Sequence, residues 1–203
     1  MLDYLRSFRP LNLLFIGLAQ GLTAFFLYFD ANLQMLIERD MHWLIIGTLS
    51  VAALGYWIND LYDSERDAIN RPAKRGPASY PRLFVILNLV LLVLIMLNAA
   101  WMLGLRYLLC FGGVSILLWL YNYKLKDVAL LGNLIIAFLS FFSVFMVRWL
   151  FPEMDVRLLL HFSLLAGLLT LCRELVKDVE DELGDRQTGA KTVAVVMGKA
   201  MSN

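Results

Sequence analysis

The sequence has little charge, little cysteine and little histidine for its length. Charged residues make up 17% of its 203 residues, against about 25% in ordinary soluble domains, and the net charge is +1. This balance excludes a disordered chain, and so small a net charge gives no field that would attract a nucleic acid, so we expect no nucleic-acid partner. The cysteines Cys110 and Cys172 both lie in apolar runs, which excludes a secreted disulfide scaffold.

Apolar residues make up 60% of the chain, and they occur in long blocks. A helix that crosses the hydrocarbon core of a bilayer needs about 20 mostly apolar residues. We predict such membrane spans near residues 11–29, 43–58, 83–103, 105–122, 128–150 and 157–172. A further apolar run from 192 to 198 begins a seventh span. No repeat or linker divides the chain, so we predict an all-α, polytopic transmembrane helical bundle that forms one domain over residues 1–203.

Lysine and arginine are distributed unevenly among the segments that join these spans. Most of the 18 lie at the N-terminus, in 59–82, in 122–127 or after residue 172. Basic residues concentrate in cytoplasmic loops. We therefore predict a multi-pass protein of the cell membrane with a cytoplasmic N-terminus and with these three segments also in the cytoplasm.

Acidic residues gather in two clusters, each directly after a predicted span on the cytoplasmic side. The first contains Asn59, Asp60, Asp63 and Asp67, and the second contains Asp178, Asp181 and Asp185, with Glu174 one turn earlier. Their spacing places most members of each cluster on one helix face, where like charges repel unless a cation binds. Oxygen ligands without histidine or cysteine nearby suit Mg²⁺. The two clusters would hold a diphosphate between them, with its hydrocarbon tail among the spans.

These residues resemble the two aspartate-rich motifs of the UbiA superfamily of intramembrane prenyltransferases. The first motif is matched by Asn59-Asp60-x-x-Asp63-x-x-x-Asp67 with Asn70-Arg71-Pro72, and the second by Arg173-Glu174-Leu175-Val176-Lys177-Asp178-Val179-Glu180-Asp181 with Gly184-Asp185. Further matches are Arg9-Pro10-x-Asn12, and Tyr121 with Lys124 ahead of Gly132-Asn133. The second motif is most similar to the branch that makes geranylgeranylglyceryl-phosphate ethers.

The resemblance implies a Mg²⁺-dependent enzyme that transfers a polyprenyl group, geranylgeranyl in that branch, from its diphosphate to a lipophilic acceptor such as geranylgeranylglyceryl phosphate. Its partners would be the diphosphate donor, the acceptor and the lipid bilayer. The metal ligands it implies are Asn59, Asp60, Asp63, Asp67, Asp178, Asp181 and Asp185. It implies catalytic roles for Lys124, Asp63 and Asp178. The substrate-binding residues it implies are Arg9, Asn12, Arg75, Tyr121, Lys124, Asn133 and Lys177.

Other functions stay open at this point. One is prenyl transfer to an aromatic acceptor in quinone, heme or chlorophyll biosynthesis, the work of other branches of the superfamily. Another is divalent-cation binding or transport, although no predicted span carries an acidic residue in its interior, where an ion pathway needs one. A third is an inactive fragment. Members of the superfamily have nine transmembrane helices, whereas this chain has six spans and the start of a seventh, so the cavity wall would be incomplete.

Overall fold

The computed structural model describes residues 7–71 and 79–201, and within these ranges it contains helices and no strand. The long helices are α2 (Pro10–Leu27), α3 (Arg39–Tyr62), α5 (Arg82–Leu103), α6 (Leu105–Tyr123), α7 (Leu131–Phe145) and α8 (Val156–Glu180). The 3₁₀-helix η4 (Met146–Trp149) extends α7. Six helices, with η4 counted as part of α7, are long and apolar enough to cross a membrane. The predicted all-α class and the six spans are therefore confirmed.

Two spans are longer than predicted. The helix α3 begins before its apolar run and continues to Tyr62, and α8 continues past its apolar run to Glu180. Hydropathy reports only the part of a helix that lies in hydrocarbon, whereas the backbone hydrogen bonds continue into the polar segments at its end. The C-terminal extensions of α3 and α8 both lie at the end of the bundle where the acidic clusters lie.

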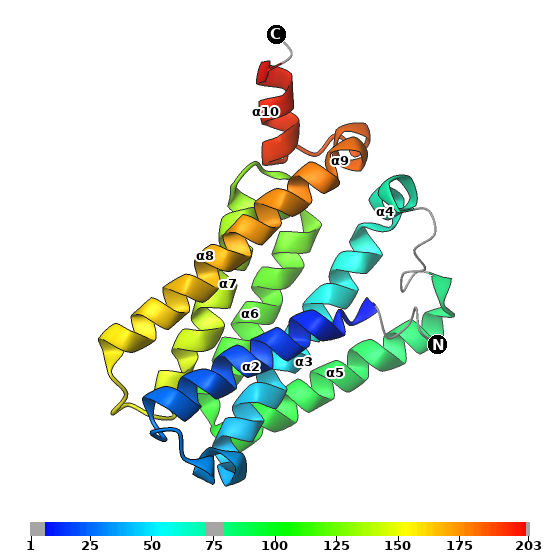
Figure 1. The fold of residues 1–203 in the computed structure, drawn as a ribbon. Coiled ribbons are helices and arrows are strands. Elements are labelled where there is room, and N and C mark those ends of the chain that lie inside the picture. Colours follow the sequence, from blue (N-terminus) through cyan, green and yellow to red (C-terminus); the bar gives the residue numbers. More distant parts are fainter. Residues whose placement is uncertain (1–6, 72–78, 202–203) are drawn as a thin grey trace.

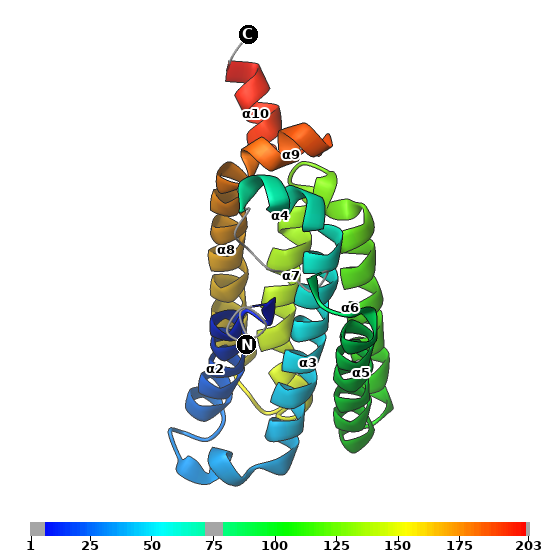
Figure 2. The same ribbon diagram turned by 90° about the vertical axis from the view of Figure 1, so that its right-hand side faces the viewer.

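The short helices complete the chain. They are η1 (Leu33–Ile37), α4 (Ser64–Asn70), η3 (Leu125–Asp127), α9 (Glu182–Thr188) and α10 (Val193–Met201). The helices α4, α9 and α10 lie together at one end of the bundle, and α9 and α10 lie beyond the end of α8 (Figures 1 and 2). The predicted start of a seventh span falls on α10.

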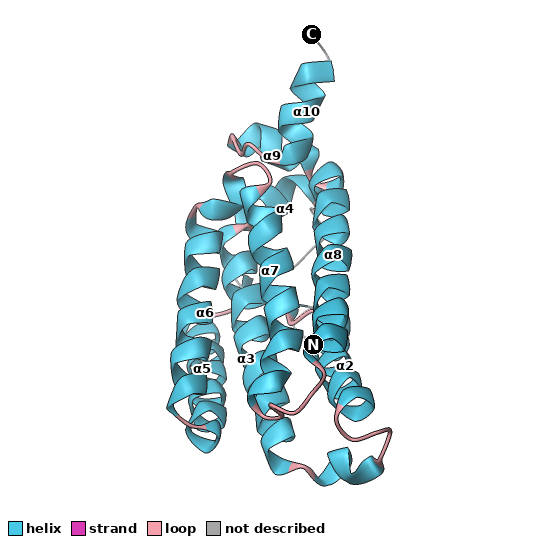
Figure 3. Cartoon of the chain, turned by 90° about the vertical axis from the view of Figure 1, so that its left-hand side faces the viewer, coloured by secondary structure: helices cyan, strands magenta, loops and turns pink. Residues whose placement is uncertain are grey.

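The long helices form three layers. The helices α5 and α6 lie on one side, α2 and α8 lie on the other, and α3 and α7 lie between them (Figures 2 and 3). The most extensive contacts join α3 to α5 and α7 to α8. The close approach of α3 to α6 depends in part on Gly47 of α3, because a Cβ at this position would lie 2.3 Å from the Phe111 ring of α6. Small residues at such contacts are typical of helix packing in membranes.

One buried polar side chain joins three of these helices. The Gln20 amide of α2 donates to the Thr48 hydroxyl of α3 at 3.1 Å and to the Ser143 carbonyl oxygen of α7 at 2.7 Å. In hydrocarbon, interhelical hydrogen bonds of this kind hold spans together. By contrast, many large apolar side chains on the outer faces of the spans are exposed, as expected for a surface that faces lipid instead of water.

Candidate active site

Both acidic clusters lie where a long helix bends into a short one. The helix α3 ends at Tyr62 and α4 begins at Ser64, so Asp63 stands between them; Asp181 stands in the same way between α8 and α9. The shared helix face inferred from the spacing of the first cluster requires that helix to continue through the cluster. The structure instead bends the chain at both aspartates, in keeping with their poor fit to a helix interior. The bends bring α4 and α9 together across the end of the bundle.

A small polar cavity of about 50 Å³ lies between the two bends, and we refer to it as the polar cavity. Residues from both motifs line it, together with side chains of α6, α7 and the N-terminal segment. Those to which the sequence analysis gave a metal-binding, catalytic or substrate-binding role are Arg9, Asn59, Asp63, Asp67, Tyr121, Asn133, Lys177, Asp178, Asp181 and Asp185. The others are Arg66, Asn70, Arg71, Lys126, Gly132, Glu174 and Thr192. The fold thus brings both clusters to one site.

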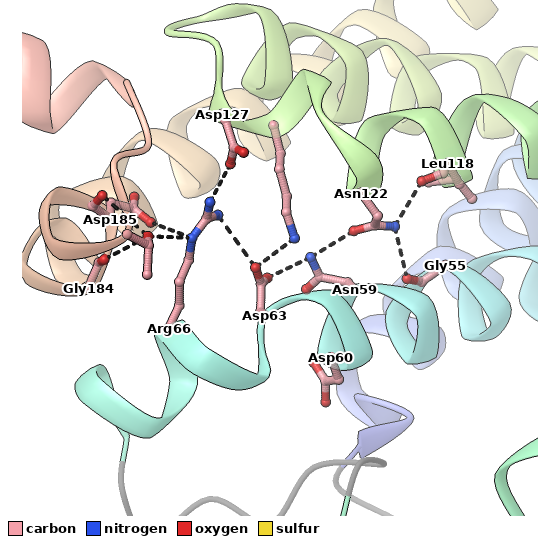
Figure 4. A network of polar contacts seen from close by, with 12 residues as sticks. Gly55, Asn59, Asp60, Asp63, Arg66, Leu118, Asn122, Asp127, Gly184 and Asp185 are labelled. Carbon is pink, nitrogen blue, oxygen red and sulfur yellow. Dashed lines mark hydrogen bonds and ion pairs between the residues drawn. The ribbon is translucent and has the colours of Figure 1, made fainter. Parts of the chain in front are cut away.

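Asp63 is the centre of a network of polar contacts at this site (Figure 4). Lys126 Nζ donates to its Oδ1 at 2.6 Å, Asn59 Nδ2 donates to its Oδ2 at 2.8 Å, and Arg66 lies 3.5 Å from Oδ1. The Asn59 amide also donates to Asn122 at 2.9 Å, which fixes its orientation. Burial would raise the pKa of Asp63, but the nearby cations, with Lys126 foremost, lower it below its ordinary value. Asp63 is therefore a carboxylate at neutral pH.

Arg66 connects the first motif to the second. Its guanidinium donates to Asp127 Oδ1 at 2.5 Å and to the Thr188 hydroxyl at 3.0 Å, and it lies 3.7 Å from Asp185 Oδ1. Burial lowers the pKa of Arg66, but the surrounding carboxylates raise it overall. At Asp185 burial prevails and raises the pKa. A cation from α4 therefore compensates part of the negative charge contributed by α9.

Asn70 joins α4 to α9 through the backbone. Its Oδ1 accepts from the Gly184 N–H at 2.9 Å, and its Nδ2 donates to the Asp181 carbonyl oxygen at 3.2 Å. A Cβ at Gly184 would lie 2.5 Å from Asn70 Nδ2, so this approach needs glycine. Arg71 adds an ion pair to the Asp181 carboxylate at 3.2 Å. These contacts set the distance between the two motifs.

Replacing Asn70 by alanine is expected to separate the two motifs while the spans stay folded. The variant loses two hydrogen bonds, each with a net value of about 1 kcal/mol, both of which hold α9. Hydrogen exchange of the amides of residues 182–188 should become faster by about tenfold or more, while the exchange of α3 and α7 stays the same. The exposed Gln187 of α9 provides the control Gln187→Ala. Equal protection of residues 182–188 in all three proteins would contradict the role of Asn70.

Arg9 approaches the site from the start of α2. It has a φ of 50°, a left-handed conformation that residues other than glycine rarely adopt. Its guanidinium donates to Asn59 Oδ1 at 2.8 Å and to Asp60 Oδ1 at 3.0 Å, and it lies 4.9 Å from the centroid of the Tyr56 ring. Burial lowers the pKa of Arg9, but the Asp60 carboxylate raises it overall.

Some residues named by the sequence analysis lie elsewhere. Asp60 points away from the network of Figure 4 and is not among the residues that line the polar cavity. Lys124, at the end of α6, is exposed, whereas Lys126, two residues later on η3, reaches Asp63. Asn12 lines a different cavity, described next, and Arg75 falls outside the described residues. The sequence has two lysines near the predicted end of this span, and the residue at which α6 ends determines which of their side chains reaches Asp63.

A much larger cavity of about 640 Å³ lies among α2, α3, α6, α7 and α8, and we refer to it as the apolar cavity. Most of its lining is leucine, phenylalanine, valine, isoleucine and alanine, and its volume falls within the range of about 300–1,000 Å³ typical of small-molecule pockets. Five residues line both cavities: Arg9, Asn59, Tyr121, Glu174 and Lys177. A ligand with a polar head and a long apolar tail would fit across this boundary.

The carboxylates of the polar cavity suit Mg²⁺ by their chemistry. Among the described residues, no three acidic, histidine or cysteine side chains come close enough to form a metal cage. Mg²⁺ seldom uses such a cage, because it retains several waters and takes one or two carboxylates together with phosphate oxygens of the substrate. Asp63 and Asp67 on one side and Asp178, Asp181 and Asp185 on the other provide such carboxylates. The donor set therefore fits the ion.

Comparison with known proteins gives one family and several relatives that share a name. Residues 13–203 match the UbiA prenyltransferase family. The chain is 35% identical to digeranylgeranylglyceryl phosphate synthase of Methanothermobacter thermautotrophicus over 77% of this chain and 56% of that protein. It is 31% identical to the protein of the same name from Methanosphaera stadtmanae over 98% of this chain and 70% of that protein.

The protein of this name from Pyrococcus abyssi is 33% identical over 71% of this chain. The matched region is 52% of that relative and 56% of the Methanothermobacter protein, so the chain spans about half the length of these two curated relatives. No solved structure matches the chain.

Proposed function

Because the chain belongs to the UbiA prenyltransferase family, we propose that it transfers a geranylgeranyl group from geranylgeranyl diphosphate to the hydroxyl group of a geranylgeranylglyceryl phosphate. The observation that carries this proposal is that five residues line both the polar cavity, which gathers both acidic motifs, and the apolar cavity of about 640 Å³. The name shared by the relatives supports the choice of acceptor.

In this proposal the diphosphate lies in the polar cavity and the prenyl chain extends into the apolar cavity. Asp63 and Asp67 of the first motif and Asp178, Asp181 and Asp185 of the second would hold Mg²⁺, which would supply positive charge to stabilise the departing diphosphate. Lys126 and Lys177 add fixed positive charge from the wall of the polar cavity. Asn59 and Asn133 orient carboxylates, because Asn59 donates to Asp63 and Asn133 donates to Asp178 at 3.0 Å.

The bond that breaks joins the allylic C1 to a diphosphate oxygen, and C1 gains positive charge as it breaks. Tyr121 lines both cavities, so its ring lies at the level proposed for C1 and would stabilise that charge. The apolar lining keeps water away from C1, which favours the acceptor over hydrolysis. Under the positive-inside rule the polar cavity faces the cytoplasm, where both substrates would present their phosphate groups.

The proposal is tested by incubating the detergent-purified chain with geranylgeranyl diphosphate and a panel of glycerol-phosphate lipid and aromatic acceptors, with Mg²⁺ or with a chelator. We expect pyrophosphate release that needs Mg²⁺ and one ether product, identified by mass. A prenylated aromatic product would instead assign the chain to a branch of the family that uses aromatic acceptors. Absence of release from a chain with intact helical content would contradict the proposal and favour an inactive fragment.

A further inference from the structure

Glu174 stands apart from the other acidic residues of the site. Among the described residues it is the one acidic side chain that lines the apolar cavity, and it also lines the polar cavity. It lies on α8 one turn before Asp178, on the membrane side of the second motif. Its side chain is 9% exposed. A carboxylate in so apolar a place is costly and calls for a functional reason.

The surroundings of Glu174 leave part of its carboxylate available. Its Oε1 accepts from the Arg173 guanidinium, and among the described residues no hydrogen bond to its Oε2 is present. The Arg9 guanidinium and the hydroxyl groups of Tyr56 and Tyr121 lie near enough to interact with its charge. An ion pair with Arg173 explains why the carboxylate tolerates burial. It does not explain why the carboxylate lies where the two cavities meet.

Ether formation releases a proton at that place. The C1–O bond to diphosphate breaks and its electron pair goes to the diphosphate. The oxygen of the acceptor hydroxyl group forms a new bond to C1, and the resulting oxonium must lose its proton to give the neutral ether. The cavity that excludes water from C1 also removes water as the proton acceptor. Asp63 and Asp178 line the polar cavity alone and are held by Lys126 and Asn133.

We propose that Glu174 is a catalytic residue that accepts the proton of the attacking acceptor hydroxyl group and passes it to solvent through the polar cavity. This inference rests on the proposed prenyl transfer. An ordinary carboxylate is a strong enough base, because the oxonium formed during attack is a strong acid. The same residue favours acceptors that carry a hydroxyl group, since they have the proton it removes.

The test is Glu174→Gln, which keeps the size of the side chain and its capacity to accept from Arg173 but cannot take a proton. With the assay above, ether formation should fall by about 100-fold or more, within the usual range for general base catalysis. Mg²⁺-dependent pyrophosphate release should fall less than ether formation, because it needs no proton acceptor, and a prenyl cation that the acceptor does not capture should last until the site opens to water and be recovered as the alcohol. The control is Glu180→Gln, an exposed α8 residue that lines neither cavity, which should retain the parental ratio of ether to alcohol.

The outcomes separate this inference from the function on which it rests. A parent chain without prenyl transfer overturns both. A parent that forms ether together with a Glu174→Gln variant that forms it equally well overturns only the role of Glu174. Loss of pyrophosphate release together with ether assigns Glu174 to substrate binding and also overturns it. If the glutamine variant does not fold, Glu174→Asp, which keeps a carboxylate, must retain ether formation above alcohol formation, and failure to do so contradicts the proposal.

Discussion

The Asp63→Asn variant is expected to lose Mg²⁺-dependent diphosphate binding, and its prenyl transfer should fall by about 1,000-fold or more. Asp63 faces the polar cavity and receives hydrogen bonds from Lys126 and Asn59. An asparagine in its place removes a charged ligand and leaves the largely buried Lys126 without its carboxylate, which should lower the free energy of unfolding by about 1.5–3 kcal/mol. Thermal unfolding in detergent, with and without Mg²⁺ and pyrophosphate, measures the loss of stability and the loss of diphosphate binding.

The parent should gain stability when Mg²⁺ and pyrophosphate are added together, because a ligand that binds only the folded state stabilises it. Asp63→Asn should show no such gain. The control is Glu65→Gln, an exposed residue of α4 that does not line the polar cavity, which should behave like the parent. An equal gain in Asp63→Asn and the parent would remove Asp63 from the metal site.

Replacing Lys126 by methionine is expected to lower prenyl transfer by about 100- to 1,000-fold, the usual effect of removing one group that stabilises transition-state charge. Lys124→Met should leave transfer within twofold of the parent, because Lys124 is exposed and lines neither cavity. The two lysines are two positions apart and differ only in where their side chains lie. Initial rates of pyrophosphate release at saturating Mg²⁺ provide the comparison.

A double variant separates the charge of Lys126 from its effect on Asp63. Asp63→Asn combined with Lys126→Met removes both members of the ion pair, so it should recover most of the stability lost by Asp63→Asn alone. Its transfer activity should remain as low as that of Asp63→Asn. A larger loss from Lys124→Met than from Lys126→Met would reverse the assignment of the two lysines.

The sequence predicts the spans and the two acidic motifs well for a physical reason. Both depend on local composition: an apolar run of sufficient length must cross the membrane as a helix, and the acidic residues follow the second and sixth runs directly. Composition and the positive-inside rule place both clusters on one side of the membrane, but they do not show that the ends of α3 and α8 lie around one polar cavity. The expectation that both clusters hold one diphosphate rested on their shared side and their chemistry, and the contacts between α4 and α9 show how the chain brings the clusters together.

The sequence could not predict which side each polar residue faces near a helix end. A bend at Asp63 changes the direction of the residues that follow, and the same applies at Asp181. The side chain of Asp60, next to the network, turns instead toward Arg9, a residue 51 positions earlier. Glu174 looked like an extension of the second acidic stripe, and only the arrangement of the two cavities sets it apart from Asp178.

The dependence of α4 on α9 has a consequence for how the protein is made. Each has seven residues, and isolated helices shorter than about 12–15 residues are marginal in water, so each depends on its packing against neighbouring elements, which include the other helix of this pair. During synthesis α4 leaves the ribosome more than a hundred residues before Asn70 can meet Gly184. The contacts between the two motifs can therefore form only after all six spans have been made. A nascent chain released just after α8 would contain all six spans and still lack the contacts of α9 with α4.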